Sequence, residues 1–338
     1  MKSFVMAAAF GAAVLGGIAS ASAGILDTVK ARGQVLCGVG PGLAGFGLPD
    51  QQGNWTGLDV DYCRAIASAV FNDPTKVKFV PLTAKDRFTA MQSGEVDVLI
   101  RNTTWTISRD TSLGLNFSAV NYYDGQGFLV RKKLNIKSAK ELAGASICTQ
   151  QGTTTELNLA DFFRSNNLKY DAVVFATNDE TVKAYESGRC DAFTTDASGL
   201  YAERLRLSNP DEHMVLADII SKEPLGSSTK HGDDQWFDVV KWVHYALVTA
   251  EELGVTKANV EQMKASPNPE IKRLLGTEGE YGKAMGMGND WAFNAIKHIG
   301  NYGEMFERNV GKESRLKIER GLNNLWSKGG LQYAPPIR

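Results

Sequence analysis

The alternation of strand-like and helical segments constrains the fold of this chain more than any other feature. Apolar, β-branched runs predict strands at residues 34–39, 76–81 and 96–100, and the patterns between them predict helices at 59–71, with Asp59 as the N-cap, and at 86–93. A strand, helix, strand order builds right-handed crossovers in a parallel sheet. These residues therefore predict a parallel α/β unit.

The same alternation recurs later, so the sequence predicts a second α/β unit. Strands are expected at 128–132, 146–149, 171–175 and 192–195, and helices at 138–142, 153–165 and 179–187. The glycines of 122–127 suit a hinge, and 221–229 is expected to be extended because Pro224 and Gly226 break helices. We predict two lobes joined by crossovers near Asp124–Phe128 and Glu223–Thr229.

The lobes are expected to be interleaved along the chain. We assign 24–124 and 229–338 to a discontinuous first lobe and 125–228 to the second. Helical patterns dominate from Asp234 onward, with helices expected at 236–253, 291–298 and 316–326. This extended C-terminal helical region contains no catalytic or metal-binding constellation, and we expect it to pack on the first lobe.

The N-terminus has the features of an export signal. Lys2 provides a positive charge, Phe4 to Ile18 an apolar stretch, and Ala21-Ser22-Ala23 a cleavage motif, so residues 1–23 are expected to be removed after Ala23. A membrane anchor is the alternative, but the stretch is short and Gly-rich and no cysteine follows it. Loss of Lys2 changes the formal charge from −1 to −2, which favours no nucleic-acid partner. We expect a soluble periplasmic protein.

Four cysteines in an exported chain predict disulfides, and four cysteines allow three pairings. Cys37 and Cys63 flank the first strand–helix unit, whereas Cys148 and Cys190 each lie beside a strand of the second unit, which favours the pairs Cys37–Cys63 and Cys148–Cys190. A zinc site is the alternative. It is disfavoured because there is no C-x-x-C and the four histidines (213, 231, 244 and 298) are scattered.

Polar side chains follow the strand at 96–100. Hydroxyl and amide groups run from Asn102 to Thr106, and Arg109 lies five residues past Thr104. Hydroxyls, backbone N–H groups and a guanidinium suit a carboxylate; the alternative is a polar loop with Arg109 paired to a surface acid. In the second unit, Asp196 ends the corresponding strand. Open α/β folds bind ligands at the carboxyl ends of their strands, so both residues are expected in one cleft.

The segment Gly40-Pro41-Gly42-Leu43-Ala44-Gly45 fits the dinucleotide pattern G-x-G-x-x-G after a strand, with Asp59 downstream. That fingerprint requires a helix at its last glycine, whereas residues 46–53 have turn composition. The glycines are better explained by close approach of the backbone to a ligand. We expect no cofactor.

Several segments, in this order and spacing, resemble the periplasmic substrate-binding proteins of polar amino-acid ABC transporters, most closely the general L-amino-acid-binding branch. They are Gly57-Leu58-Asp59-Val60-Asp61, Arg101-Asn102-Thr103-Thr104-Trp105-Thr106, Gln151-Gly152-Thr153-Thr154-Thr155-Glu156, Ser187-Gly188-Arg189-Cys190-Asp191-Ala192 and Gly330-Leu331-Gln332-Tyr333-Ala334-Pro335-Pro336-Ile337-Arg338. The resemblance spans the mature chain. It implies an α/β, two-lobed periplasmic binding protein fold of type II with two hinge strands.

The resemblance also implies ligand contacts. Arg109 would hold the α-carboxylate as a bidentate fork, with the hydroxyl and N–H of Thr104 and the N–H of Thr154. The carbonyl of Asn102 and the carboxylate of Asp196 would receive the α-ammonium. Further candidates for the same pocket are Thr153, Gln150, Arg101 and Arg87.

Side-chain preference depends on Arg87, which resembles an arginine that meets the side-chain carboxylate in glutamate/aspartate-binding relatives; the alternative is a solvated helix charge. Those relatives carry a second arginine where Gly40 stands and a histidine near Asn178, so we expect broad binding that favours acidic and amide amino acids. Arg101 can instead brace the strand end. Phe46 and Trp105 either cover the pocket or belong to the core.

The resemblance implies a monomeric protein that closes over one free L-amino acid and presents it to an inner-membrane ABC permease complex, without metal, cofactor or catalysis. One alternative is an exported dehydratase on the same fold, with Asp196 or Asp191 as acid or base, although no Ser-His-Asp or Cys-His set supports it. The other is a sensor subunit that signals to a membrane receptor.

Overall fold

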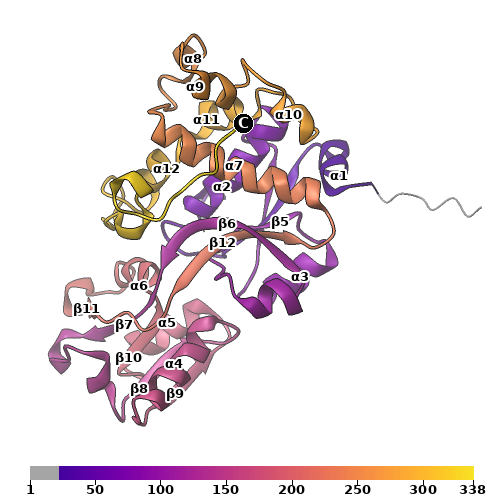
Figure 1. Ribbon diagram of the computed structural model, residues 1–338. Coiled ribbons are helices and arrows are strands. Elements are labelled where there is room, and N and C mark those ends of the chain that lie inside the picture. Colours follow the sequence, from indigo (N-terminus) through magenta and orange to yellow (C-terminus); the bar gives the residue numbers. More distant parts are fainter. Residues whose placement is uncertain (1–22) are drawn as a thin grey trace, which may run out of the picture.

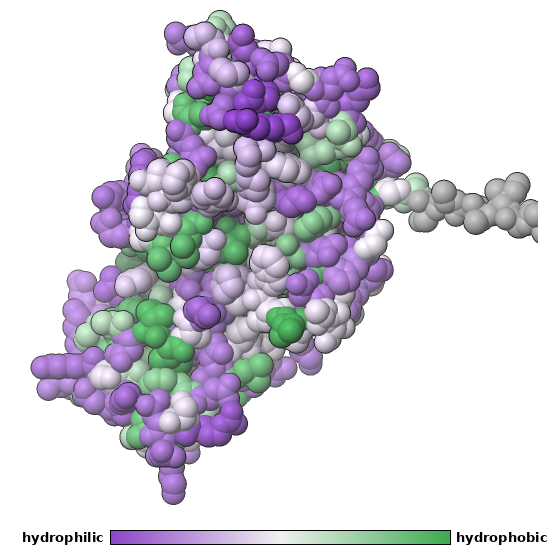
Figure 2. Space-filling model, viewed as in Figure 1, coloured by the Kyte–Doolittle hydropathy of each residue, from purple (hydrophilic) through white to green (hydrophobic). Residues whose placement is uncertain are grey.

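The computed structural model describes residues 23–338, so the predicted export signal lies outside the described residues except for Ala23. Two lobes lie one above the other, and the long strands β6 (Leu115–Asp124) and β12 (Glu223–Lys230) run side by side between them (Figure 1). Hydrophilic and hydrophobic residues are interspersed over the face of both lobes drawn in Figure 2. No helix within residues 23–338 is long and apolar enough to cross a membrane.

The first lobe contains a five-stranded sheet in the order β4-β1-β5-β12-β6. Strand β1 (Val35–Val39) pairs in parallel with β4 (Val77–Pro81) and β5 (Val98–Leu99), which confirms the predicted parallel unit. Strand β12 pairs antiparallel with β5 and β6. The remaining elements are α1 (Ile25–Arg32), β2 (Leu48–Pro49), β3 (Trp55–Thr56), α2 (Leu58–Phe71) and α3 (Arg87–Ser93).

The second lobe repeats this arrangement, with the sheet order β11-β7-β10-β8-β9. Strand β8 (Ser146–Gln150) pairs in parallel with β9 (Asp171–Phe175) and β10 (Ala192–Asp196), whereas β7 (Gln126–Arg131) and β11 (His213–Val215) are antiparallel neighbours. The helices are α4 (Thr154–Ser165), α5 (Asn178–Glu186) and α6 (Ala197–Arg204), with a 3₁₀ turn at Ala139–Leu142.

The chain passes between the lobes at two adjacent points. Strand β6 continues into β7 through Gly125, where an added Cβ would lie 2.3 Å from Cγ2 of Ile219, so only glycine fits. The return crossing is β12, whose pairing with β6 begins at Glu223 opposite Asp124. The predicted division between residues 228 and 229 falls inside this strand.

The C-terminal helices pack into the core of the first lobe. They are α7 (Asp234–Glu252), α8 (Val260–Met263), α9 (Pro269–Leu274), α10 (Tyr281–Ala284), α11 (Trp291–Ile299) and α12 (Tyr302–Asn309). Trp236, Ile296 and Phe306 belong to the same buried cluster as Ile66 of α2 and Val39 of β1. The extended helical region is therefore part of the first lobe's core.

The predicted helix at 316–326 is wrong. This segment is irregular, with short 3₁₀ turns at Gly321–Asn323 and Trp326–Lys328. Lys317 and Gly321 have φ values of 53° and 46°, which an α-helix excludes, and Arg320 forms an ion pair with Glu251 at 3.1 Å. Tertiary polar contacts thus override the local helical pattern.

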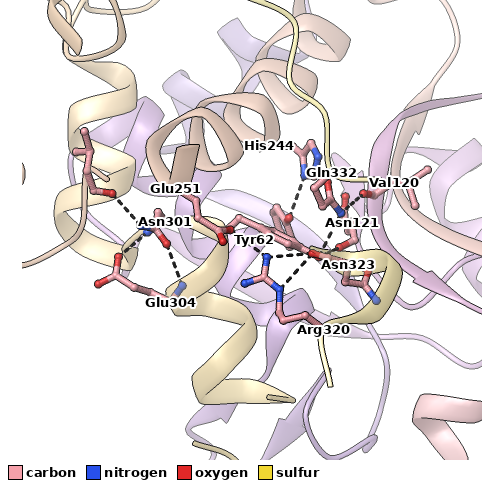
Figure 3. A network of polar contacts seen from close by, with 12 residues as sticks. Tyr62, Val120, Asn121, His244, Glu251, Asn301, Glu304, Arg320, Asn323 and Gln332 are labelled. Carbon is pink, nitrogen blue, oxygen red and sulfur yellow. Dashed lines mark hydrogen bonds and ion pairs between the residues drawn. The ribbon is translucent and has the colours of Figure 1, made fainter. Parts of the chain in front are cut away.

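Residues 320–332, here called the C-terminal strap, cover the edge strand β6. Asn323 accepts from the backbone N–H of Tyr123 at 2.7 Å and donates to its carbonyl at 3.0 Å, and Gln332 donates to the Val120 carbonyl at 3.1 Å. Tyr302 of α12 donates to the Asn121 carbonyl at 2.9 Å. In Figure 3, Asn323 and Gln332 of the strap lie beside Val120 and Asn121 of the strand. The strap satisfies backbone groups that an edge strand otherwise leaves open.

Both predicted disulfides are confirmed. Cys37–Cys63 joins β1 to α2 with Cα atoms 6.1 Å apart, and Cys148–Cys190 joins β8 to the residue two before β10, with Cα atoms 5.6 Å apart. Each bond fastens a helix or loop to a sheet strand within one lobe. In the chain-entropy account, loops of this length contribute about 3–4 kcal/mol each.

Candidate functional site

A cavity of about 280 Å³ lies between the lobes, at the carboxyl ends of the parallel strands of both sheets. It is lined by eight of the nine predicted ligand-binding residues: Arg87, Arg101, Asn102, Thr104, Gln150, Thr153, Thr154 and Asp196. Arg109 does not line it directly. The structure thus brings together residues from 87 to 196 that the chain separates widely.

The second-lobe wall consists largely of helix N-termini. Helices α4, α5 and α6 each begin where a strand of the sheet ends, and Thr153, Thr177 and Asp196 are their N-cap residues. The Thr153 hydroxyl accepts from the N–H of Glu156 at 3.2 Å. The first N–H groups of a helix have no partner within the helix and carry partial positive charge. This wall is therefore suited to an anionic group.

Arg87 enters the cavity from the first lobe. It is only 3% exposed, so it is not a solvated helix charge. Nη1 donates to Oγ1 of Thr103 at 3.1 Å, Nε has no partner among the described residues, and the guanidinium lies 4.7 Å from the centroid of the Phe88 ring. Burial, followed by the charges of Arg101 and Arg109, lowers the pKa of Arg87 well below its usual value.

Arg109 lies behind the cavity wall, in a π-helical turn at Ser108–Ser112. Its Nη1 donates to the Thr104 carbonyl at 2.7 Å, and its guanidinium lies 5.0 Å from the Phe88 ring centroid, so Phe88 contacts two guanidinium groups. The predicted alternative of a surface ion pair is not observed. Burial lowers the pKa of Arg109 to about 10, although Glu223 and Asp196 oppose this.

Arg101 completes a cluster of three buried arginines. Its Nε donates to the Leu82 carbonyl at 2.9 Å, so it both lines the cavity and braces the strand end. Burial lowers its pKa to about 10. Within residues 23–338, none of the three arginines has a carboxylate within ion-pair distance. Because a buried charge without a counter-ion costs several kcal/mol, this cluster favours binding of an anion.

Asp196 supplies negative charge from the second lobe. Its side chain is buried, and its carboxylate accepts no hydrogen bond from any described residue. Burial raises the pKa of Asp196 well above its usual value, as do the nearby carboxylates of Asp124 and Glu223. Asp124, which accepts from the N–H of Gly125 at 2.8 Å, has a pKa raised to about 6, mainly by burial. A cation bound beside Asp196 would compensate the negative charge that Asp196, Asp124 and Glu223 bring together.

Glu223, at the start of β12, is a central residue that sequence reasoning missed. Its fully buried carboxylate accepts from the hydroxyls of Thr104 at 2.5 Å and Thr154 at 2.8 Å, from Nδ2 of Asn158 at 2.7 Å and from Ser221 at 2.6 Å. It therefore joins both lobes beside the cavity. The only sequence signal was its place at the expected second crossover.

Asn102 adopts a left-handed backbone conformation with φ of 28°. Its N–H donates to the Asp59 carboxylate at 3.0 Å. The prediction that Asp59 caps its helix is wrong, because α2 begins at Leu58 after Gly57 and Asp59 lies inside the first turn. Burial raises the pKa of Asp59 to about 7. Asp59 therefore fixes the turn that carries Asn102 into the cavity.

On the far wall, the sequence indicated Gln150 and Asn178 but not Glu203. Asn178 donates through Nδ2 to Oε1 of Glu203 at 2.5 Å, and Glu203 pairs with Arg206 at 2.9 Å. Gln150 donates to the Ala176 carbonyl at 3.2 Å. The free amide oxygens and hydroxyls of this wall can meet either donors or acceptors.

The remaining sequence candidates lie elsewhere. Phe46 is buried against Tyr122 in the first-lobe core, and Trp105 stacks on Phe117; neither lines the cavity. No helix begins at Gly45, which excludes the dinucleotide fingerprint, whereas Gly40 and Gly42 line the cavity. The described part of the chain contains no group of three or more residues that could hold a metal ion.

Comparisons with known proteins agree with this architecture. The chain is 64% identical to the general L-amino acid-binding periplasmic protein AapJ of Rhizobium johnstonii over the full length of both chains. It is 58% identical to the glutamate/glutamine/aspartate/asparagine-binding protein BztA of Rhodobacter capsulatus, over 97% of this chain and 96% of that protein. A periplasmic binding protein of an ABC transporter from Brucella ovis, solved with glutathione bound, is 61% identical and superposes with a TM-score of 0.92 over 94% of this chain and 100% of the other.

Family membership follows from the length of the match as well as from the fold. Residues 35–331, which include both sheets and the cavity between them, match one family of proteins. The chain belongs to the bacterial extracellular solute-binding proteins, family 3.

Proposed function

We propose that this protein binds free L-amino acids in the periplasm, with a preference for acidic and amide side chains, and delivers them to an inner-membrane ABC permease. The observation that carries the proposal is the presence in one cavity of buried arginines without counter-ions on the first lobe and an unbonded carboxylate, Asp196, on the second. An α-amino acid carries a carboxylate and an ammonium on one carbon, so it matches both charges at once.

The α-carboxylate is proposed to bind between Arg109 and the N-terminus of α4. Apart from the bond to the Thr104 carbonyl, the guanidinium of Arg109 donates to no described residue. The N–H of Thr154 is at the first position of α4 and lies across the cavity. The α-ammonium is assigned to Asp196 and the Asn102 carbonyl. A hydrogen-bonded charge pair of this kind contributes more than a neutral one.

The side chain is proposed to extend toward Arg87, Gln150 and Asn178. Arg87 favours a carboxylate, whereas the amide groups of Gln150 and Asn178 suit a carboxamide equally well. The names of two relatives support a broad preference. BztA is named as a glutamate/glutamine/aspartate/asparagine-binding protein, and AapJ as a general L-amino acid-binding protein.

Closure of the lobes is proposed to proceed at β6–β7 and β12, as a population shift driven by contacts that exist only when both lobes touch the ligand. The protein is proposed to act as a monomer after removal of residues 1–23. Mass spectrometry of the exported protein tests the cleavage, since a mature chain beginning at Gly24 is expected.

A thermal-shift screen of the twenty L-amino acids, followed by calorimetry, tests the specificity. A ligand that binds only the folded state raises the midpoint according to its concentration and affinity. Acidic and amide amino acids should give the largest shifts. A response to acids alone would contradict the broad preference, and no response to any amino acid would contradict the proposed function.

The enzymatic alternative has weaker support. Asp191 is exposed and accepts from the N–H and hydroxyl of Ser146, away from the cavity. Of the two acids considered for this role, only Asp196 lines the cavity. Incubation with cyclic amino and keto acids is expected to give no turnover. Permease and ATPase genes beside this gene would favour transport over sensing.

A further inference from the structure

A second cavity of about 640 Å³ lies beside the first. Pro41, Gly42 and Asp179 line both cavities. Its walls come from three parts of the molecule: the first-lobe segment 41–57, the second lobe at Asp179 of α5 and at residues 202–206 around the end of α6, and residues 308–316 of the C-terminal region. The candidate site is therefore one end of a longer, branched cleft, and a single amino acid accounts only for the smaller part.

On the first-lobe side, Pro41 and Gly42 form the boundary that the two cavities share. A Cβ added to Gly42 would meet no atom within 4 Å, and a Cβ at Gly40 would come no closer than 3.6 Å to Cγ of Arg101. Gly42 has no unusual φ that would require glycine. The absence of a side chain at this position thus leaves space open rather than relieving backbone strain.

We propose that the cleft also binds γ-glutamyl peptides, with the glutamyl residue in the first cavity and the remainder of the peptide in the second. This inference rests on the proposed function. Recognition of a free α-carboxylate and a free α-ammonium leaves only the side chain as a point of extension. A glutamyl side chain extended through an amide would meet Gln150 and Asn178, which lie on the first cavity's wall and can accept its N–H and donate to its carbonyl.

The second cavity has a mixed wall that suits a short peptide. Leu48, Leu205 and Leu316 offer apolar contacts. Of its three arginines, Arg308 pairs with Asp61 and Arg206 with Asp179 and Glu203, whereas Arg315 forms no ion pair with any residue between 23 and 338. Arg315 is assigned to the terminal carboxylate of the peptide.

Calorimetry with L-glutamine, γ-L-glutamylglycine and α-L-glutamylglycine tests this assignment. L-Glutamine and γ-L-glutamylglycine should bind with affinities within about tenfold of each other. α-L-Glutamylglycine, whose α-carboxyl is in the peptide bond, should bind at least a hundredfold more weakly. Binding of glutamine without γ-L-glutamylglycine would overturn the inference and leave the proposed function intact, and binding of neither would overturn both.

Two variants locate the extension. Arg315→Glu should weaken γ-L-glutamylglycine at least fivefold and leave L-glutamine within twofold, whereas Lys328→Glu, an equal charge change at an exposed residue outside both cavities, should alter neither. Gly42→Leu should lower the affinity for γ-L-glutamylglycine relative to that for L-glutamine at least tenfold, and Gly42→Ala should lower it less. If neither Arg315→Glu nor Gly42→Leu changes the ratio of the two affinities, for γ-L-glutamylglycine and for L-glutamine, the peptide does not extend into the second cavity.

Discussion

The hydroxyl oxygens of Thr104 and Thr154 lie 3.2 Å apart, although the first belongs to the strand end of one lobe and the second to the start of α4 in the other. Both hydroxyls donate to the same oxygen of Glu223. The two lobes therefore touch through a buried polar network beside the binding cavity. Such a network is costly when one member is lost, because its partners remain buried without a hydrogen bond.

Glu223→Gln should lower the free energy of unfolding by about 1–3 kcal/mol. In one orientation the amide NH₂ faces the amide donor of Asn158 and the Ser221 hydroxyl. In the other it faces the two threonine hydroxyls, which must rotate to accept from it and so lose their own bonds to residue 223. Urea unfolding measures this loss. Glu95→Gln is the matched control, since Glu95 is exposed and pairs with no described residue. Equal stability of both variants would contradict the role assigned to Glu223.

Arg109→Ala and Asp196→Ala should each weaken amino-acid binding by more than tenfold, which corresponds to more than about 1.4 kcal/mol. Each change leaves one charge of the bound zwitterion without its counter-ion in a buried site. Calorimetry of the purified variants provides the measurement, and Lys328→Ala, outside both cavities, controls for the loss of a charge. Retained affinity in either variant would contradict the proposed pairing of the ligand's two charges with Arg109 and Asp196.

Local patterns predicted most of the scaffold, because strand and helix periodicity is encoded within each segment. The two parallel units were predicted from this periodicity, and the pairs Cys37–Cys63 and Cys148–Cys190 from the places of the cysteines beside the predicted strands. The helix predicted at 316–326 is not formed, because Arg320 and Asn323 bind residues distant in the sequence, Glu251 and Tyr123. A window of neighbouring residues contains no information on such contacts.

The site was predictable only where a residue type has one obvious chemistry. Asp196 was expected in the cleft from its place at a strand end, and Arg87 from the family resemblance; both line the cavity. Glu223 and Glu203 are buried by tertiary packing; apart from the place of Glu223 at the expected second crossover, nothing in their sequence surroundings distinguishes them from surface acids. Arg109 was placed correctly near the cavity, but its bond to the Thr104 carbonyl sets it behind the wall.

Asp59 predicts a pH dependence of stability. Its pKa is about 7 in the folded protein and near 3.8 in the unfolded chain, so the folded state binds more protons between these values. Its contribution to the free energy of unfolding should therefore fall as the pH rises from about 4 to 7, on the order of 1.4 kcal/mol per pKa unit.

Asp59→Asn keeps an acceptor for the N–H of Asn102 and removes the titration. Urea unfolding at pH 5 and pH 8 should show the variant gaining stability relative to wild type at the higher pH. Subtracting the two proteins cancels the other titrating groups. A difference that is the same at both pH values would show that Asp59 does not titrate in this range.

The C-terminal strap should stabilise the hinge strand β6 through Asn323. Asn323→Ala removes the bonds to both backbone groups of Tyr123, one residue before Asp124 and the crossover into β7. Because these groups would be left without protein partners, we expect a loss of about 1–3 kcal/mol in the free energy of unfolding. Hydrogen exchange of the Tyr123 amide should also accelerate, since its N–H donates to Asn323.

Asn324→Ala is the matched control, because the side chain of Asn324 makes no hydrogen bond with the described residues. In Asn324→Ala, the amide of Tyr123 should exchange at the same rate as in wild type. The comparison separates the strap's contact from a general effect of alanine in this segment. Unchanged exchange at Tyr123 in Asn323→Ala would mean that the Asn323 contact does not stabilise this part of β6.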